Sequence, residues 1–389
     1  MSLETGDLFL AMMPYWRLSG FYFFYFATIG ALIPYWGLYL KSINFSASEI
    51  GQLIALMLLS RIVAPNIWGW IADARGQYMG VLRLAASLSV IAFCGVFLGT
   101  TFWWLAIVMF VFAFFWDACL PQLEAVTLSH LAGHSRAYAR VRLWGSVGFI
   151  VSVMGLGYLF DAVALWWLLP SLLSLLLAIL VMAMIVPEWE TQTVRSSTLP
   201  FHKVFLQPHV GALLVACFLM QASHGPYYTF YSIYLEEYHY SKSLIGMLWA
   251  FGVLCEIGIF VIMHRVQMRY GARRVLLVSS GVAAVRWLLI GFFPEHVGIL
   301  ILAQALHAIT FGAYHAAAIS LIYKFFARPH QVRGQAIYGS VSFGLGGVLG
   351  SFYSGIAWSR FGPSGTFEMA SILALAAFAV VYFAVRPNS

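Results

Sequence analysis

Long apolar segments are the feature of this sequence that most restricts what it can fold into. Dividing the chain at its charged clusters leaves twelve apolar segments, each close to the ~20 residues that a helix needs to cross the hydrocarbon core of a bilayer. They cover residues 15–40, 48–71, 78–99, 102–131, 138–160, 164–186, 209–235, 243–264, 273–293, 297–325, 333–358 and 364–385. Because none shows the alternation of a half-buried strand, we expect an all-α membrane protein with twelve transmembrane helices.

The composition supports a lipid-solvated protein. Only 9% of the 389 residues are charged, and the mean hydropathy is +0.87, whereas soluble proteins carry roughly a quarter charged residues. The first segment is too long for a signal-peptide core and lacks a clear cleavage site, so we expect it to remain in the protein. All four cysteines fall inside apolar segments. The sequence therefore predicts buried thiols, with no disulfide, no metal site and no cofactor.

The basic residues are distributed unevenly between the two sides of the predicted membrane. If both termini are cytoplasmic, sixteen of the 21 lysines and arginines lie on the inner side. The outer side holds only Lys41, Lys242 and Arg360, and Arg61 and Arg286 lie within segments. This asymmetry follows the positive-inside rule. It predicts a multi-pass protein of the bacterial inner membrane with cytoplasmic termini, and it explains the pI near 9.2 without a nucleic-acid partner.

The two halves of the chain repeat one plan. The polar stretch 188–208 separates an N-terminal bundle (1–187) from a C-terminal bundle (209–389). Similar sequences recur in both halves: "SASEIGQLIA" (46–55) matches "SKSLIGMLWA" (241–250) at an offset of 195, and "WGSVGF" (144–149) matches "YGSVSF" (338–343) at an offset of 194. We therefore expect two pseudo-symmetric six-helix bundles. Bundles of this kind enclose a binding cavity near the bilayer midplane and rock to expose it to alternate sides.

The stretch "GWIADARGQ" (69–77) resembles the loop signature of the major facilitator superfamily, G-x-x-x-D-x-x-G. The match includes Gly69, Asp73 and Gly76, while Gln77 replaces the usual basic residue. The resemblance implies the major facilitator fold, a monomer, and a cytoplasmic gate that contains Asp73 and Arg75.

A narrower resemblance involves two further blocks. "LPQLEAVTLSHL" running into "YARVRLWGSVGF", together with "LHAITFGAYHAAA", resembles the phenylpropionate-permease-like branch, which is itself similar to the lactose/proton symporter group. This resemblance covers essentially the whole chain. It implies a proton-coupled uptake symporter for a small organic acid, with an aromatic carboxylate such as phenylpropionate favoured.

Charged residues inside apolar segments are candidates for the transport site, because such residues are costly in lipid and usually mark pathways. Arg61 lies within "LLSRIVAPNIWGW", and Glu256 lies 195 residues later at the equivalent position of the second half. The second and eighth helices face each other across the cavity in this fold. We therefore expect Glu256 to neutralise Arg61, directly or through water.

The other intramembrane candidates lie in the fourth, fifth, ninth and tenth segments. They are Asp117, Glu124, Arg142, Arg286, His307 and His315. Asp117 and Glu124 are seven residues apart and share a helix face, whereas two histidines eight residues apart differ by about 80° around a regular helix.

The resemblance to the lactose group implies roles for several of these residues. It implies a substrate-contacting ion pair of Glu124 with Arg142. Glu256, Arg286 and His307 match functional positions of that group. Thr310 stands where the group has a proton-releasing glutamate, and Gln304 replaces a lysine, so the proton route of that group cannot be copied.

Charge balance offers a mechanism for coupling. Arg61, Arg142 and Arg286 balance Asp117, Glu124 and Glu256 when all three acids are ionised. Protonating one acid leaves a positive charge that a monoanionic substrate would neutralise. We expect Glu256 to be the titrating group, with Asp117 second. His307 and His315 can relay protons or donate hydrogen bonds to the ligand.

Aromatic residues are placed to surround a flat apolar body. The candidates are Tyr35, Trp36, Tyr231, Trp144 and Phe149, with Tyr227 and Tyr228 beside Tyr231; each alone is also compatible with simple packing. Gly30 and Pro34 in the first helix and Gly225 and Pro226 in the seventh are expected to break and bend those helices.

Other functions remain open at this stage. The cargo could instead be a sugar or nucleoside held by Glu124 and Arg142, or a polyamine or other cation, and a receptor of the same fold could bind without transport. The buried ion pairs could also serve only to fix helix packing. An enzyme is not expected, because there is no nucleotide loop, metal cluster or nucleophile–base pair.

Overall fold

The computed structural model describes residues 14–131, 135–188, 207–326 and 330–385, and within these ranges all regular structure is helical. The first group of elements runs from α2 to α7. It comprises α2 (Tyr15–Ser42), α3 (Ala47–Arg75), α4 (Tyr78–Cys94), η1 (Gly95–Phe97), α5 (Phe102–His130), α6 (Ser135–Ala162), η2 (Leu165–Trp167) and α7 (Leu168–Ile185).

The second group runs from α9 to α16. It comprises α9 (Pro208–Ser223), α10 (Gly225–Glu237), α11 (Lys242–Tyr270), α12 (Ala272–Phe292), α13 (Val297–His307), η3 (Ala308–Ala313), α14 (Tyr314–Phe325), α15 (Gln331–Gly339), η4 (Ser340–Gly346) and α16 (Gly347–Ala384). The short elements η3 and η4 are π-helical turns inside longer helical runs.

All twelve predicted segments are helical in the structure. Ten helical runs of the described residues are long and apolar enough to cross a membrane. The seventh segment is not among them because it divides at His224 into α9 and α10. The eleventh and twelfth segments form one run, Arg333–Ala384, which kinks at Gly362, where the backbone adopts φ 70°. The structure thus has the all-α membrane architecture that the sequence predicts.

Helix ends follow from local chemistry. α3 begins at a capping box, in which the Ser46 hydroxyl accepts from the Glu49 backbone N–H and the Glu49 carboxylate accepts from the Ser46 N–H. α11 begins at the equivalent Ser241, whose hydroxyl accepts from Leu244 N–H. α3 ends at Gly76, which has φ 63°. This left-handed conformation favours glycine, and it explains the last glycine of the "GWIADARGQ" stretch.

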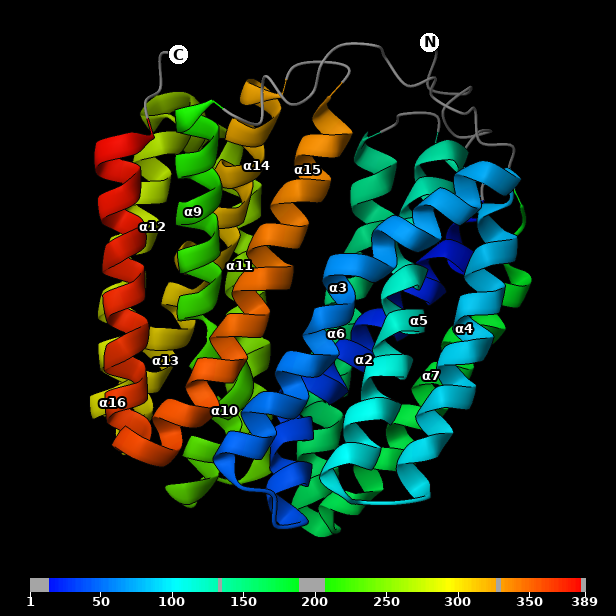
Figure 1. Cartoon of the computed structure of the whole chain (residues 1–389), viewed down its shortest axis with the longest axis horizontal. Helices are drawn as coiled ribbons and strands as arrows, with labels where there is room; N and C mark the ends of the chain where they lie inside the picture. Colours follow the sequence, from blue (N-terminus) through cyan, green and yellow to red (C-terminus); the bar gives the residue numbers. More distant parts are fainter. Residues whose placement is uncertain (1–13, 132–134, 189–206, 327–329, 386–389) are drawn as a thin grey trace.

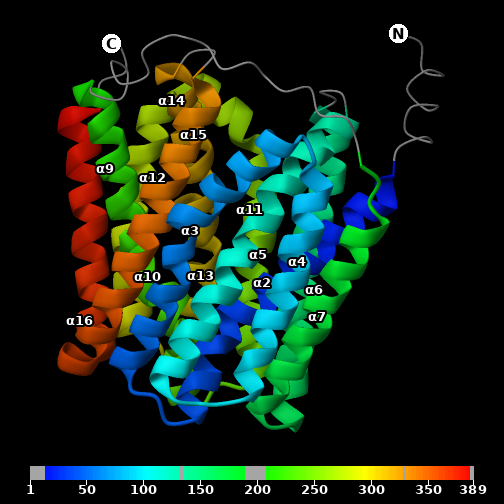
Figure 2. The same cartoon turned by 45° about the vertical axis from the view of Figure 1, so that its right-hand side comes forward.

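The helices form two groups that lie side by side. Figure 1 shows α2–α7 on one side of the molecule and α9–α16 on the other, with α3 next to α15. In the turned view of Figure 2 the two groups overlap, and α11 appears behind α3 and α5. Most of the predicted linker, 188–208, lies outside the described residues, so the predicted bundle boundaries stay predictions.

The two groups are joined at the end where α2 meets α3 and α10 meets α11. There the Asp161 carboxylate accepts hydrogen bonds from the backbone N–H groups of Lys242 (2.7 Å) and Ser243 (3.2 Å) at the start of α11. The Lys41 ammonium pairs with Glu237 at 3.0 Å. Tyr35 and Tyr158 donate further hydrogen bonds from the first group to α11 at this end. We refer to it as the closed end.

Glycines allow close helix contacts within and between the groups. A Cβ on Gly30 would lie 2.7 Å from the Phe149 carbonyl oxygen, so α2 and α6 meet backbone to backbone. The predicted break of the first helix is wrong: α2 continues through Gly30 and Pro34. The packed neighbours hold the helix together despite the hydrogen bond that proline removes. The seventh segment does divide immediately before Gly225 and Pro226.

Two glycines of α6 allow this packing to be tested. A Cβ at Gly148 would collide with the Phe23 carbonyl, whereas one at Gly155 meets nothing within 4 Å. We expect Gly148→Ala to lower the thermal unfolding midpoint by several degrees, because overpacking a core costs roughly 1–3 kcal/mol. Gly155→Ala should leave the midpoint unchanged or raise it, because alanine favours a helix by about 1 kcal/mol over glycine. Thermal unfolding in one detergent measures both variants, and equal midpoints would contradict the packing described here.

Candidate functional site

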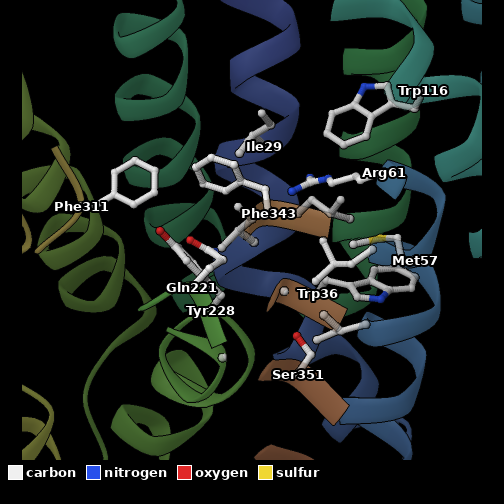
Figure 3. A pocket seen from close by; sticks show the side chains of 16 residues that line it. Ile29, Trp36, Met57, Arg61, Trp116, Gln221, Tyr228, Phe311, Phe343 and Ser351 are labelled. Atoms are coloured by element: carbon white, nitrogen blue, oxygen red, sulfur yellow. The ribbon is translucent and has the colours of Figure 1, made fainter. Parts of the chain in front are cut away.

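A pocket lies between the two groups of helices, next to the closed end and toward the middle of the molecule. Its cavity volume is about 170 Å³. Both groups contribute to it: α2, α3 and α5 from the first, and α9, α10, η3, η4 and α16 from the second. The lining residues are Ile29, Leu32, Ile33, Trp36, Ile54, Met57, Leu58, Arg61, Trp116, Gln221, Gly225, Tyr228, Phe311, Phe343, Gly347 and Ser351. Figure 3 shows these side chains converging from opposite sides.

Arg61 is the cation of this pocket. It lies on α3, and Figure 3 shows its guanidinium pointing toward the ring of Phe343. Its Nε lies 3.4 Å from Asp117 Oδ1 on α5, and the Ser60 hydroxyl donates to the other carboxylate oxygen at 2.5 Å. Asp117 is buried, with 7% of its side chain exposed, whereas 32% of the Arg61 side chain is exposed. The Asp117 carboxylate therefore contacts the Nε side of the Arg61 guanidinium, and Arg61, unlike Asp117, lines the pocket.

The predicted pairing of Arg61 with Glu256 is wrong. Glu256 pairs instead with His307 of α13, at 2.7 Å between Oε1 and Nε2. Each charge thus meets a partner on the next-but-one helix of its own group: α3 with α5, and α11 with α13. The repeat correctly predicted that residues 61 and 256 occupy equivalent places. The repeat did not predict the partner of Arg61, because Asp117 of the same group lies nearer to Arg61 than Glu256 of the opposite group does.

A buried polar cluster surrounds the Glu256–His307 pair. Arg286 of α12 is fully buried; its Nε donates to the Ala303 carbonyl at 2.7 Å and its Nη1 to the Thr310 hydroxyl at 3.2 Å. The guanidinium also lies over the ring of Tyr227, 4.3 Å from the centroid. Thr310, which replaces a glutamate of the lactose group, is thus a neutral acceptor for Arg286. Gln304, which replaces a lysine, accepts from the Tyr227 hydroxyl at 2.9 Å.

The π-helical segment η3 changes the geometry of the tenth segment. Regular α-helical spacing separates residues 307 and 315 by about 80° around the axis, but the wider π turn offsets that rotation. The rings of His307, Phe311 and His315 consequently form one stack, with centroid distances of 5.4 and 6.2 Å and interplanar angles of 13° and 9°. π-Bulges are frequent at functional sites. The sequence analysis did not predict the π turn at η3.

Glu124 and Arg142 form the ion pair that the resemblance implies. Arg142 Nε lies 3.7 Å from Glu124 Oε1, and the guanidinium lies over Phe26 at 4.0 Å. The pair joins α5 to α6 within the first group and does not belong to the pocket lining. Its contact with substrate stays a prediction.

The predicted aromatic residues occupy different places. Trp36 lines the pocket. Tyr35 lies at the closed end, where its hydroxyl donates to the Val153 carbonyl at 2.6 Å. Tyr231 packs against Tyr227 and Trp249, and Trp144 donates to the Tyr15 hydroxyl at 3.0 Å. Phe149 is buried where α6 crosses α2.

Three aromatic pocket residues were not among the candidates predicted from the sequence: Trp116, Phe311 and Phe343. Trp116 and Phe311 contribute rings from opposite sides of the pocket. They are 195 residues apart, so the internal repeat was the signal that could have identified them as a pair. Trp116 stacks on Phe112 at 5.7 Å, just as Phe311 stacks on His307.

The predicted gate residues lie at the far end of α3 from the closed end. Asp73 and Arg75 are exposed, and Asp73 accepts a hydrogen bond from the Tyr78 hydroxyl at 2.5 Å. This contact joins α3 to α4 within the first group. A gating role for Asp73 and Arg75 stays a prediction.

Comparison with known proteins identifies the family. The model of the MFS_1-like family matches residues 15–369. The chain is 30% identical to the probable 3-phenylpropionic acid transporter of Escherichia coli K12, over 93% of this chain and 95% of the relative. It is 23% identical to the maltose permease of Geobacillus stearothermophilus, over 87% of this chain and 86% of the relative.

Solved structures agree on the fold. The crystal structure of the nucleoside transporter NupG superposes with a TM-score of 0.82 at 16% identity, covering 94% of this chain and 98% of that one. These similar proteins are transporters and not enzymes. The chain belongs to the MFS_1-like family, and it is a multi-pass membrane transporter of the major facilitator superfamily.

Proposed function

We propose that the protein is a proton-coupled symporter that takes up a small aromatic carboxylate across the bacterial inner membrane. The observation that carries this proposal is the chemistry of the pocket. Among the lining residues that the structure describes, Arg61 is the one cation, none is acidic, and most others are aliphatic or aromatic. Such a surface is complementary to a monoanion with an apolar body. The name of the E. coli relative, a probable 3-phenylpropionic acid transporter, supports the same substrate class.

The size of the pocket favours a substrate with one ring. Its cavity volume is about 170 Å³, and an apolar protein cavity of about 150 Å³ can bind one benzene molecule. Trp36, Trp116, Tyr228 and Phe311 supply aromatic surfaces for such a ring. Because one chain supplies every lining residue, a monomer would suffice for transport.

Alternating access would come from rocking of the two predicted bundles, 1–187 and 209–389. The distribution of basic residues predicts that the closed end faces outward. The hydrogen bonds of Asp161 and the Lys41–Glu237 pair would then keep the pocket shut from the outside in the inward-facing state. Opening that end requires these contacts to break. Asp73 and Arg75 would lie at the opposite, cytoplasmic gate.

The proton would be carried by the Glu256–His307 pair. The Glu256 carboxylate lies 2.7 Å from His307 Nε2, so a proton could pass between the two groups. Arg286 lies in the same buried cluster. When Glu256 is protonated, the Arg286 charge is no longer balanced locally, so a bound carboxylate restores neutrality in the transport region. Asp117, held by Ser60 and Arg61, is the second candidate.

A neutral sugar or nucleoside is the alternative substrate. It is supported by the name of the maltose permease relative and by that of the xanthosine permease of E. coli, which is 23% identical over 89% of this chain and 88% of the relative. Each hydroxyl group of a bound solute that leaves water needs a hydrogen-bond partner, because burying it without one costs free energy. The pocket offers few, chiefly Arg61, Gln221, Tyr228 and Ser351, and this disfavours the alternative.

Arg61 can be tested with a matched pair of ligands. We expect wild-type protein to bind 3-phenylpropionate much more tightly than 3-phenylpropionamide, which has the same body without the charge. Arg61→Ala should weaken binding of the acid by about 100-fold, because a charge-assisted hydrogen bond in a desolvated site is worth roughly 2–5 kcal/mol. Arg61→Lys should retain part of the affinity. Isothermal titration in detergent measures each constant.

The amide is the control for this experiment. Its affinity should change little in Arg61→Ala, because it offers no charge for Arg61 to neutralise. If Arg61→Ala binds the acid as tightly as the wild type does, the anion site is elsewhere. If the wild type binds sugars or nucleosides but not the acid, the alternative substrate class is correct.

Proton coupling predicts a pH response. Adding 3-phenylpropionate to lightly buffered proteoliposomes should raise the external pH as protons enter with the anion, and uptake should slow as external pH rises. Glu256→Gln should abolish proton movement and accumulation while preserving exchange of labelled for unlabelled substrate, because the neutral amide mimics the protonated acid. A pH electrode and a radiolabel assay measure the two activities.

Asp117→Asn is the matched comparison for Glu256→Gln. It should retain substrate-driven proton movement if Glu256 is the titrating acid. If coupling is lost in Asp117→Asn and kept in Glu256→Gln, the titrating acid is Asp117. Normal coupling in both variants would contradict the proposed mechanism.

A further inference from the structure

We propose that Phe311 is a partition between the substrate pocket and the Glu256–His307 pair, so that protons reach the pair through the pocket only when substrate displaces the Phe311 ring. This inference rests on the proposed symport function. It adds a positioning residue that touches substrate on one side and the titrating pair on the other.

Phe311 lies at the boundary between the two sites. Its ring lines the pocket, and Figure 3 shows it on the side opposite Trp116. The same ring lies nearly parallel to the imidazole of His307, with centroids 5.4 Å apart. His307 has only 6% of its side chain exposed and does not line the pocket. Glu256 has 14% of its side chain exposed and does not line the pocket either. The Phe311 ring thus lines the pocket and also stacks on His307.

The π-helical turn fixes this position. Phe311 lies inside η3 (Ala308–Ala313), and the next residue, Gly312, packs directly on α11. A Cβ at Gly312 would lie 2.8 Å from Ile259 Cγ2 and 3.7 Å from Glu256 Cγ. The segment that carries Phe311 is thus in contact with the helix that carries the acid. The Phe311 ring is therefore carried by a segment that packs close to Glu256.

The charged and titratable groups around the pair come from several helices. Arg286 approaches from α12 through Thr310, and His224, at the start of α10, has its ring 6.3 Å from that of His307. Tyr227 lies 5.3 Å from His307, and His315 stacks on the other side of Phe311. Tyr228 lines the pocket and lies close enough to Glu256 to interact with it electrostatically, whereas none of the other groups lines the pocket. Phe311 is the lining residue whose ring stacks on His307, so we expect removal of the phenyl ring to connect pocket water to His307.

Phe343 provides a matched control. It is also a phenylalanine of the pocket lining and lies in a π-helical turn, η4. Its ring contacts those of Phe311, His315 and Tyr338. It therefore reaches His307 only through the ring of Phe311, which stacks on His307 directly. Substituting alanine for either phenylalanine removes the same number of atoms from the pocket lining. Only the loss of Phe311 should uncover the pair.

The test measures passive proton entry without substrate. Purified transporter is reconstituted in liposomes that contain a pH-sensitive dye, and an acid pulse is applied outside. We expect Phe311→Ala to admit protons at least about tenfold faster than wild type, a loss of about 1.4 kcal/mol of barrier. Phe343→Ala should stay within about twofold of wild type. Both variants should bind 3-phenylpropionate more weakly, because both lose an aromatic surface.

A double variant shows the route of the leak. If protons pass through the pair, the double variant Phe311→Ala with Glu256→Gln should admit protons as slowly as Glu256→Gln alone; a variant that does so is called tight below. A leak that persists in the double variant, or equal leaks in Phe311→Ala and Phe343→Ala, would overturn the partition. If Phe311→Ala does not reconstitute as folded protein, Phe311→Val, which keeps more apolar volume, takes its place. A tight Phe311→Val would equally overturn the proposal.

Wild-type protein separates the two possible failures. If 3-phenylpropionate drives no proton movement in wild type, the proposed function is wrong and this inference fails with it. If wild type couples normally and the Phe311 variants are tight without substrate, only the partition is wrong.

Discussion

Neutralisation of intramembrane charge within each group of helices is the constraint on which the rest of the structure depends. Arg61 is held by Asp117, and Glu256 by His307; each pair joins the second and fourth membrane-spanning helices of its own group. Separating opposite charges at a site shielded from water is costly. A pair of Arg61 with Glu256 across the cavity would have to break whenever the two groups move apart. Pairing inside each group avoids that cost.

The interface between the groups follows from the same arrangement. Its charged contacts lie at the closed end, where Lys41 and Glu237 are partly exposed and surface ion pairs are worth only about 0–1 kcal/mol. Deeper in, the groups meet through small residues: a Cβ on Gly51 would lie 2.7 Å from Gly355 Cα. Close approach of the two backbones adds van der Waals contact at the closed end. Such contacts can separate without leaving an unpaired charge behind.

Sequence reasoning predicted the fold well and the site only in part. Twelve apolar segments and the repeat were enough for the helices, because membrane-spanning backbone has few alternatives. The repeat also placed Arg61 and Glu256 at equivalent depths. Their partners could not be predicted, because a choice between Asp117 and Glu256 depends on side-chain distances of a few ångströms. Phe311 was missed for another reason: a π turn alters which side chains share a face, and no residue pattern marks it.

The repeat relation between Trp116 and Phe311 shows how one ancestral plan can serve two tasks. Both rings line the pocket, and each stacks on the residue four positions earlier, Phe112 or His307. In the first group the stacked neighbour is apolar, and the nearby charge is Arg61, which faces the cavity and suits an anion. In the second group the neighbour is His307, which pairs with Glu256. In the mechanism that we propose, a titratable side chain at one of two equivalent positions would separate proton binding from anion binding, while both rings would still line the same pocket.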